Sequence, residues 1–232
     1  YSELELQAQR DACVAQLHED FAFVAKANIG GEFMDQDDID RLTQIGAQTW
    51  QRHFDRNLGI SAAEQARVER LPQELPATEK LLDDRPEHIV LRTRSVDYEP
   101  YLEIDMEVPE YLYNRGELYN LSIARGTLTR EERFKINEHM ISTIRMLDRL
   151  PFPPELARVP RYASTHHEAV NGTGYPRKLK GDQLSVPEKV LVVADIFEAL
   201  TAADRPYKEA KSIVAAIDIM AGMVDRGHID GA

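Results

Sequence analysis

Hydrophobic residues recur at helical spacing along most of this chain, which predicts a mainly helical fold. Residues 1 to about 27 form the first predicted helix, whose apolar side chains fall on roughly one side: Leu4, Leu6, Cys13, Leu17, Phe21 and Val24. This helix is either an ordinary packing helix or a connection from an upstream region. A second helix is predicted over residues 37–57, with an inward side made of Ile39, Leu42, Ile45, Ala47 and Trp50.

Capping-box signatures mark three further helix starts, at Ser61, Thr129 and Ser185, each followed three residues later by Glu. The helix from Thr129 is predicted to run to Pro151, with an apolar face made of Ile136, Met140, Ile144 and Leu147. Other helices are predicted over residues 154–167 and 212–223. Residues 190–203 are apolar almost all round, so this helix is expected to be central and buried.

Prolines interrupt residues 71–112, where the helical period is lost. Residues 88–91 and 102–106 alternate between apolar and polar side chains, which predicts a short hairpin. The expected fold class is therefore all-α, a helical bundle with a small irregular or hairpin insertion around residues 85–107. Residues 1–30 are expected to be an N-terminal helix or linker, and residues 31–232 one domain.

The composition narrows the class of protein. The chain has 232 residues, a formal net charge of −12 and one cysteine, so it has no intrachain disulfide framework and suits a reducing, cytoplasmic compartment. The acidic balance argues against general nucleic-acid binding. No apolar run is long enough to span a bilayer. Because the sequence opens on Tyr1 without Met, we expect a fragment of a longer protein.

Histidines and one aspartate are the candidate metal ligands. His166 and His167 are adjacent and precede a Gly-rich loop at residues 172–176, where both imidazoles could face one cavity. His139 and Asp195 lie on or beside apolar helix faces. Taken singly, each is explained by structure, as a core histidine or a hydrogen-bonded buried carboxylate. Taken together they favour a metal site, since imidazole and carboxylate suit Fe, Mn or Zn.

A basic cluster follows the loop, and it consists of Arg177, Lys178, Lys180, Arg205, Lys208 and Lys211. On an acidic chain, this concentration near the histidines favours a surface that contacts phosphate. A solvated loop face is the alternative interpretation.

Two blocks of this sequence resemble the HD-GYP family. One is HHEAVNGTGYPRKL from His166, the other is ADIFEALTAADRPYK from Ala194, and the likeness covers residues 117–223. The resemblance implies an HD-type helical bundle with a two- or three-metal centre. In this chain we expect one or two divalent ions, of Fe or Mn. It also implies a bacterial, cytoplasmic protein that hydrolyses cyclic di-GMP, or a related cyclic dinucleotide, to pGpG or GMP. Protein signalling partners and a homodimer are further expectations.

The resemblance also assigns roles to single residues. The metal ligands would be His139, His166, His167 and Asp195. Tyr175 would shape the rim of the site, and Arg205 and Lys208 would contact phosphate. Arg177 and Lys178 are predicted to contact the substrate because they belong to the basic cluster, not through the resemblance.

The sequence departs from the family at the His-Asp pair that gives the family half its name. Tyr119 and Asn120 stand at that position, and Ile123 replaces the following Lys. Asn120 offers a carbonyl oxygen without charge, and a tyrosine is a weak ligand unless ionised. Asp40 is a candidate for a missing ligand. Two hypotheses follow: a metal-dependent phosphodiesterase, with Asp195 and Asn120 among its catalytic residues, or a non-catalytic module that binds the nucleotide or a protein.

Overall fold

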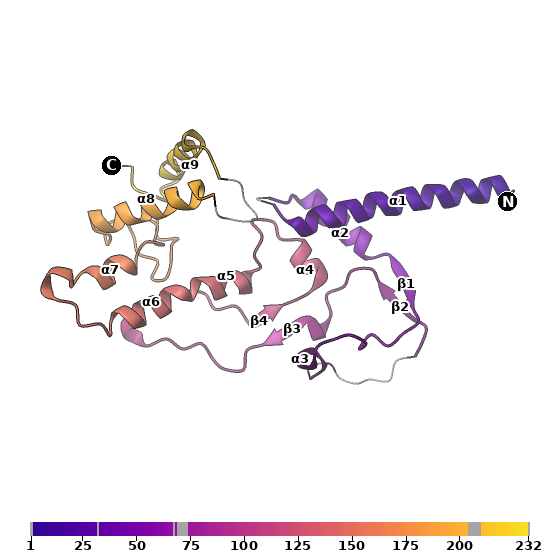
Figure 1. The fold of residues 1–232 in the computed structure, drawn as a ribbon, viewed down its shortest axis with the longest axis horizontal. Coiled ribbons are helices and arrows are strands. Elements are labelled where there is room, and N and C mark those ends of the chain that lie inside the picture. The colour runs from indigo at the N-terminus through magenta and orange to yellow at the C-terminus, as the bar shows by residue number, and fades with distance from the viewer. Residues whose placement is uncertain (1, 32, 67, 69–73, 204–209, 232) are drawn as a thin grey trace. The chain divides into compact units, whose positions relative to one another are not determined.

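The computed structural model describes residues 2–31, 33–66, 68, 74–203 and 210–231. The chain divides into two compact units, each built from segments distant in sequence (Figure 1). The first contains Tyr1–Arg94 and Pro109–Arg133, and the second contains Ser95–Val108 and Phe134–Ala232. The predicted boundary at residue 30 lies inside the first unit, and the division into a linker helix and one domain stays a prediction.

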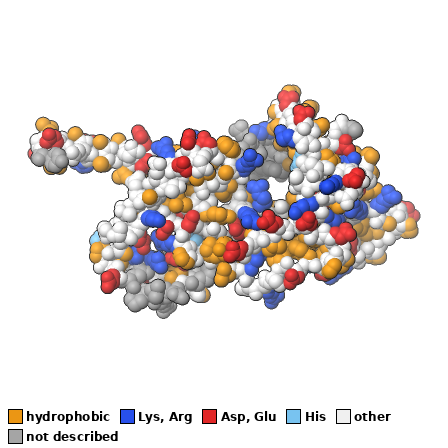
Figure 2. Space-filling view, turned by 180° about the vertical axis from the view of Figure 1, so that it is seen from behind, with side chains coloured by type: hydrophobic (Ala, Val, Ile, Leu, Met, Phe, Trp, Pro, Cys, Tyr) orange, Lys and Arg blue, Asp and Glu red, His pale blue; other side chains and the backbone are white. Residues whose placement is uncertain are grey.

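The first helix, α1 (Glu3–Ile29), is confirmed and begins at a capping box formed by Ser2 and Glu5. Its apolar side chains are not gathered on one buried side, since Leu4 is 80% exposed and Phe21 is 76% exposed. Figure 2 shows hydrophobic and charged side chains mixed along the projecting helix. One residue near its C-terminal end is buried: Asp20 accepts hydrogen bonds from Gln16 and Gln48.

The second helix is shorter than predicted. α2 (Gln36–Gly46) buries Leu42 and Ile45 as expected, but residues 49–52 are a strand. This strand, β1 (Thr49–Arg52), pairs antiparallel with β2 (Ala77–Lys80). The prediction of a helix to residue 57 is wrong because a partner distant in sequence supplies the backbone hydrogen bonds that a helix would have made locally.

The predicted hairpin is half right. β3 (Ile89–Leu91) is a strand, but its antiparallel partner is β4 (Tyr111–Asn114) rather than residues 102–106. Leu102 instead ends a short 3-10 turn and is fully buried in the core of the second unit. The first unit also contains α3 (Ala62–Gln65), with its predicted capping box, and α4 (Glu117–Leu121).

The predicted helix from Thr129 is two helices, α5 (Arg130–Asn137) and α6 (His139–Leu147), on either side of Glu138. The Thr129 capping box is present, because Thr129 and Glu132 exchange hydrogen bonds. Met140 and Ile144 are buried as predicted, and Ile144 packs with Leu102 in the core of the second unit. Ile136, predicted on the same apolar face, is 52% exposed and is not buried with them.

The remaining helices differ from prediction in length or burial. Residues 154–167 contain a 3-10 turn and the short α7 (Val159–Ala163) rather than one helix. α8 (Val186–Thr201) begins at the predicted capping box, and α9 (Ile213–Asp225) agrees closely with its prediction. The expectation that α8 is buried all round is wrong: Val186 is 72% exposed and Val190 59%, since the helix packs on α7 and α9 only along part of its surface.

The fold class is mainly helical, as predicted. Within the described ranges, strands occur only as two antiparallel pairs, β1 with β2 and β3 with β4. None of the helices in the described residues has both the length and the apolar character needed to cross a membrane.

Candidate metal centre

Three histidines meet in the second unit. His139 is the first residue of α6, and His166 and His167 lie in the turn that follows α7. Each offers one ring nitrogen, and these nitrogens all lie within 4.8 Å of one another. The His166 and His167 ring centroids are 4.1 Å apart, and those of His139 and His167 are 5.2 Å apart. The structure therefore brings together the three imidazoles that the sequence singled out.

Backbone carbonyls define the proton positions on two of these rings. Nδ1 of His139 lies 2.7 Å from the carbonyl oxygen of Ile136, and Nδ1 of His166 lies 2.8 Å from that of Ala163. A carbonyl oxygen only accepts hydrogen bonds, so each Nδ1 carries the proton and donates it. Each Nε2 then keeps a free lone pair, which is the arrangement of a metal-binding histidine whose second nitrogen is held by a backbone carbonyl.

His167 is held in its neutral form. Burial and, to a lesser extent, the neighbouring His166 and His139 together lower the pKa of this imidazole to about 4, against the opposing charge of Asp195. A histidine binds metal only when it is neutral. The electrostatics of the cluster therefore favour the ligand form of His167 at neutral pH.

Asp195 reaches the cluster from α8. Its Oδ2 lies 3.4 Å from Nδ1 of His167. The expectation of a buried aspartate is wrong, because its side chain is 39% exposed at the open side of α8. Three imidazoles with an adjacent carboxylate form a donor set of the kind that Fe, Mn and Zn accept, so these residues fit a divalent transition metal.

The loop after the histidines folds back onto them. Gly174 packs so closely that a Cβ there would lie 2.4 Å from Cα of Glu168. The next residue, Tyr175, donates its backbone N–H to the carbonyl oxygen of His167. Its ring stacks on the His167 imidazole, with centroids 4.7 Å apart and planes inclined by 25°. Burial and, second to it, the charge of Asp195 raise the pKa of Tyr175 to about 12, so the phenol stays protonated.

Glu168 is a residue of this site whose role the sequence pattern did not predict. It is 1% exposed, and its two carboxylate oxygens accept the backbone N–H groups of Arg177 and Leu179, each at 2.8 Å. Burial raises the pKa of Glu168, against these hydrogen bonds and the charges of Arg177 and Arg161. The sequence feature that could have indicated its role is its position, directly after the histidine pair and before the apolar Ala169.

The predicted phosphate-contacting cations have partners within the protein. The Arg177 guanidinium donates to the carbonyl oxygen of Leu102 and to the Ser164 hydroxyl, both at 2.9 Å. Lys178 lies 3.2 Å from the Asp105 carboxylate. These contacts fix the loop, and phosphate binding by the two cations stays a prediction. Arg205 and Lys208 lie outside the described residues.

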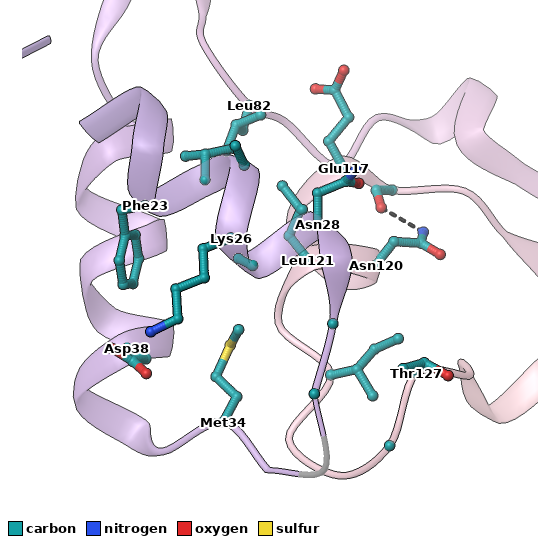
Figure 3. Close-up of a pocket in the computed structure, with 18 of the residues that line it drawn as sticks. Phe23, Lys26, Asn28, Met34, Asp38, Leu82, Glu117, Asn120, Leu121 and Thr127 are labelled. Atoms are coloured by element: carbon teal, nitrogen blue, oxygen red, sulfur yellow. Dashed lines mark hydrogen bonds between the residues drawn. The ribbon is translucent and has the colours of Figure 1, made fainter. Parts of the chain in front are cut away.

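Asn120 lies in the first unit, where it lines a cavity of about 740 Å³ between the ends of α1, α2 and α4 (Figure 3). Phe23, Met34 and Leu121 give this cavity apolar walls, with Lys26 among its charged residues. The side-chain amide of Asn120 donates to the carbonyl oxygens of Asn114 and Gly116, at 3.1 and 2.6 Å. Both bonds use the side-chain nitrogen of Asn120, so its side-chain carbonyl oxygen takes no part in them.

Tyr119 is used inside the first unit. Its hydroxyl donates to Glu131, at 2.9 Å, and Glu131 is 5% exposed. Burial raises the pKa of Tyr119, and the adjacent Glu131 raises it further. The phenol is therefore neutral at physiological pH and lacks the charge that would make it a strong metal ligand.

Comparison with known proteins identifies the class. A family model described as HD domain matches residues 76–232, which is more than half of the chain. The chain therefore belongs to the HD domain family. Its His166–Pro176 block and its curated relatives place it among the HD domains of the HD-GYP type.

The relatives cover different parts of the chain. It is 40% identical over 95 residues to a 3'3'-cGAMP-specific phosphodiesterase of Vibrio cholerae, covering 41% of the chain and 20% of that protein. It is 34% identical over 125 residues to a cyclic di-GMP phosphodiesterase of Pseudomonas aeruginosa, covering 54% and 27%. A cyclic di-GMP phosphodiesterase of Thermotoga maritima is 38% identical over 88 residues, covering 38% and 23%. The chain spans about a fifth to a quarter of the length of these relatives.

Proposed function

We propose that this chain is a divergent HD-GYP domain with a metal-dependent phosphodiesterase-like site that acts on a cyclic dinucleotide. The observation that carries the proposal is the meeting of His139, His166 and His167 at one point, with Asp195 beside them. The names of the relatives supply the substrate class, since they specify cyclic di-GMP and 3'3'-cGAMP. The product would be linear pGpG or, after a second cleavage, GMP.

Each residue has a proposed part in this function. His139, His166, His167 and Asp195 hold the metal, for which Fe or Mn is our proposal. When bound, such an ion supplies Lewis-acid polarisation of a phosphoryl oxygen and a bound water of lowered pKa. Tyr175 offers a neutral hydroxyl at the rim, where it can donate a hydrogen bond to the substrate. Arg177, Lys178, Arg205 and Lys208 are the proposed contacts to phosphate.

Asn120 is the proposed reason for weak hydrolysis. In the family's pattern an aspartate stands at this position, and its negative charge offsets the repulsion between two bound cations. An asparagine leaves that repulsion uncompensated, and the neutral Tyr119 supplies no charge in its place. Asp195 and Asn120 are accordingly the proposed catalytic residues, with one metal bound more strongly than a second. Asp40 remains a candidate additional ligand, although its carboxylate accepts a hydrogen bond from Gln36 on α2.

The second candidate function is a non-catalytic module that binds a cyclic dinucleotide or a protein partner. The observation that favours it is the hydrogen bond from Tyr119 to the buried Glu131. This bond gives Tyr119 a structural role in place of the ligand role of the family's histidine. Such a module would keep the histidine cluster, and with it one metal, while losing turnover.

Metal analysis combined with a turnover assay separates the two functions. The protein is loaded with Fe²⁺ or Mn²⁺ under anaerobic conditions and incubated with cyclic di-GMP and, separately, with 3'3'-cGAMP. Metal-dependent formation of linear dinucleotide that is lost in His166→Ala supports the phosphodiesterase. Tight nucleotide binding without product supports the binding module. His18→Ala, a change of an exposed histidine on α1, is the matched control and should alter neither result.

A further inference from the structure

Glu168 joins the histidine pair to the loop that follows it. It is the residue directly after His167, and it is 1% exposed. Oε1 accepts the backbone N–H of Arg177 and Oε2 accepts that of Leu179, so the two oxygens hold alternate residues of the loop. A buried carboxylate with both oxygens hydrogen-bonded to one segment acts as a clamp on that segment.

The clamp fixes the loop around Tyr175. On the near side, Gly174 lies against the backbone of Glu168 with no space for a side chain. After Tyr175 in the chain, the hydrogen bonds from Arg177 and Leu179 to the Glu168 carboxylate hold the other end of the loop. Between these two points, the Tyr175 ring is stacked on His167, at 4.7 Å between centroids. The position of this ring therefore depends on the geometry of a loop that Glu168 holds at its far end.

We propose that Glu168 is a positioning residue of the metal centre, which orients the His167 imidazole by holding the loop that stacks Tyr175 against it. The inference rests on the proposed function, because it takes His167 as a metal ligand. Groups behind the direct ligands set the ring orientation of a metal-binding histidine, and their loss weakens metal affinity by about 10–100-fold. Glu168 does this through the loop rather than through a hydrogen bond to the imidazole.

The same geometry separates Glu168 from the metal ligands. Both of its oxygens are taken by backbone N–H groups of the loop, and it is buried, whereas His139 is exposed and His166 and His167 are half-buried. A glutamine at this position keeps the shape and one acceptor oxygen. Its NH₂ group would face a backbone N–H, so one of the two hydrogen bonds is lost. Glu168→Gln is therefore a change of minimal size that opens the clamp.

The test is a double-mutant cycle on the full chain with Co²⁺ as the probe. Co²⁺ binding is followed by its visible absorption, which reports both affinity and ligand geometry. We expect Glu168→Gln and Tyr175→Ala each to weaken Co²⁺ binding by about 10-fold. The double variant should be no weaker than Tyr175→Ala alone, because both changes break one chain of contacts. The absorption spectrum of Co²⁺ should change in the same way in all three variants.

Glu188→Gln is the matched control. Glu188 is also a buried glutamate of the second unit that accepts a backbone N–H, but its hydrogen-bond partners are Ser185 and Arg161 rather than Arg177 and Leu179. This variant should lose stability while its Co²⁺ affinity stays within about twofold of the wild type. Equal weakening by Glu188→Gln, or additive effects of the two site variants, would overturn the positioning role.

Hydrogen exchange tests the clamp without any metal. The backbone amides of Arg177 and Leu179 should both exchange slowly in the wild type, and one of the two should exchange at least about 10-fold faster in Glu168→Gln, since that amide loses its acceptor. Unchanged exchange rates would refute the clamp. If the wild type binds no Co²⁺ but its amides exchange more slowly than those of Glu168→Gln, the proposed metal function is refuted and the loop clamp is not.

Discussion

The phenol ring of Tyr175 lies against the imidazole of His167, with 4.7 Å between centroids and 25° between planes. One face of the tyrosine is thereby used inside the protein, and its hydroxyl stays protonated because burial raises its pKa. An aromatic pair of this kind contributes about 0.5–1.5 kcal/mol beyond the burial of its area. The tyrosine of the loop motif is therefore a packing partner of a proposed ligand as well as a residue of the rim.

Tyr175→Phe and Tyr175→Ala should separate these two roles. Phenylalanine keeps the stack but removes the hydroxyl. We therefore expect cyclic di-GMP affinity to fall by about 3–10-fold, which corresponds to the loss of one hydrogen bond, while metal affinity is retained. Alanine removes both and should weaken metal and nucleotide together. Isothermal titration with each ligand measures the two effects. Equal metal affinities for the alanine and wild-type proteins would contradict a role for the stack.

Glu188 should make the stability of the second unit depend on pH. Burial acts to raise its pKa, but hydrogen bonds from Ser185 and the Arg161 guanidinium outweigh burial and hold the pKa below its usual 4.5. A carboxylate with a lowered folded-state pKa contributes stability above the pKa of the unfolded chain, and loses it as pH falls through the folded-state pKa. Glu188→Gln should therefore cost about 1–3 kcal/mol near pH 7 and progressively less below about pH 4.5.

Urea denaturation of both proteins at pH 7.5 and pH 4 checks this expectation. Ser185→Ala is a useful companion, because it removes the helix cap and leaves the pair with Arg161 in place. It should cost about 1 kcal/mol. A difference between wild type and Glu188→Gln that is the same at both pH values would contradict the lowered pKa.

Local signals in the sequence predicted most helix starts. The capping boxes at Ser61, Thr129 and Ser185 are all present, because each depends on hydrogen bonds between residues three apart. The errors come from contacts across long sequence separations. β1 is a strand through its pairing with residues 77–80, and Leu102 is buried through packing with Ile141 and Ile144. No pattern within a window of a few residues contains these partners.

The candidate site was predictable in its residues but not in its geometry. Residue types and the resemblance to HD-GYP domains identified His139, His166 and His167, which the structure brings together. The exposure of Asp195 could not be predicted, because it depends on which side of α8 its neighbours cover. The two bonds of Glu168 were also hidden, since they require the loop to turn back over the residues that precede it.

A bound divalent cation should stabilise the folded protein. A ligand that binds only the folded state increases the free energy of unfolding. Mn²⁺ at 100 times its Kd should therefore raise this free energy by about 2.7 kcal/mol. Thermal unfolding with and without Mn²⁺ measures this gain, and a chelator should reverse it. The gain should disappear in His166→Ala and shrink in Asp195→Asn, and His18→Ala should retain it. A gain that persists in His166→Ala would place the cation elsewhere.

Restoring the His-Asp pair should raise turnover if its loss limits hydrolysis. We expect the double variant Tyr119→His with Asn120→Asp to increase cyclic di-GMP hydrolysis by about 10-fold or more, the scale on which groups at a metal site change activity. In the absence of metal, the double variant should lose stability, because two sets of hydrogen bonds are broken. An aspartate at residue 120 cannot donate to the carbonyl oxygens of Asn114 and Gly116, and histidine replaces the hydroxyl that Glu131 accepts.

The metal-free double variant should therefore be less stable than the wild type by about 1–3 kcal/mol. Saturating Mn²⁺ should restore more stability in this variant than in the wild type, because a carboxylate binds the cation better than an amide does. Product analysis by chromatography and denaturation with and without Mn²⁺ are measured on the same preparations. Tyr119→Phe is the control: it removes only the bond to Glu131, so it should lower stability without raising turnover. A double variant that gains metal-dependent stability but no turnover would show that the binding module, rather than a weakened phosphodiesterase, is the function of this chain.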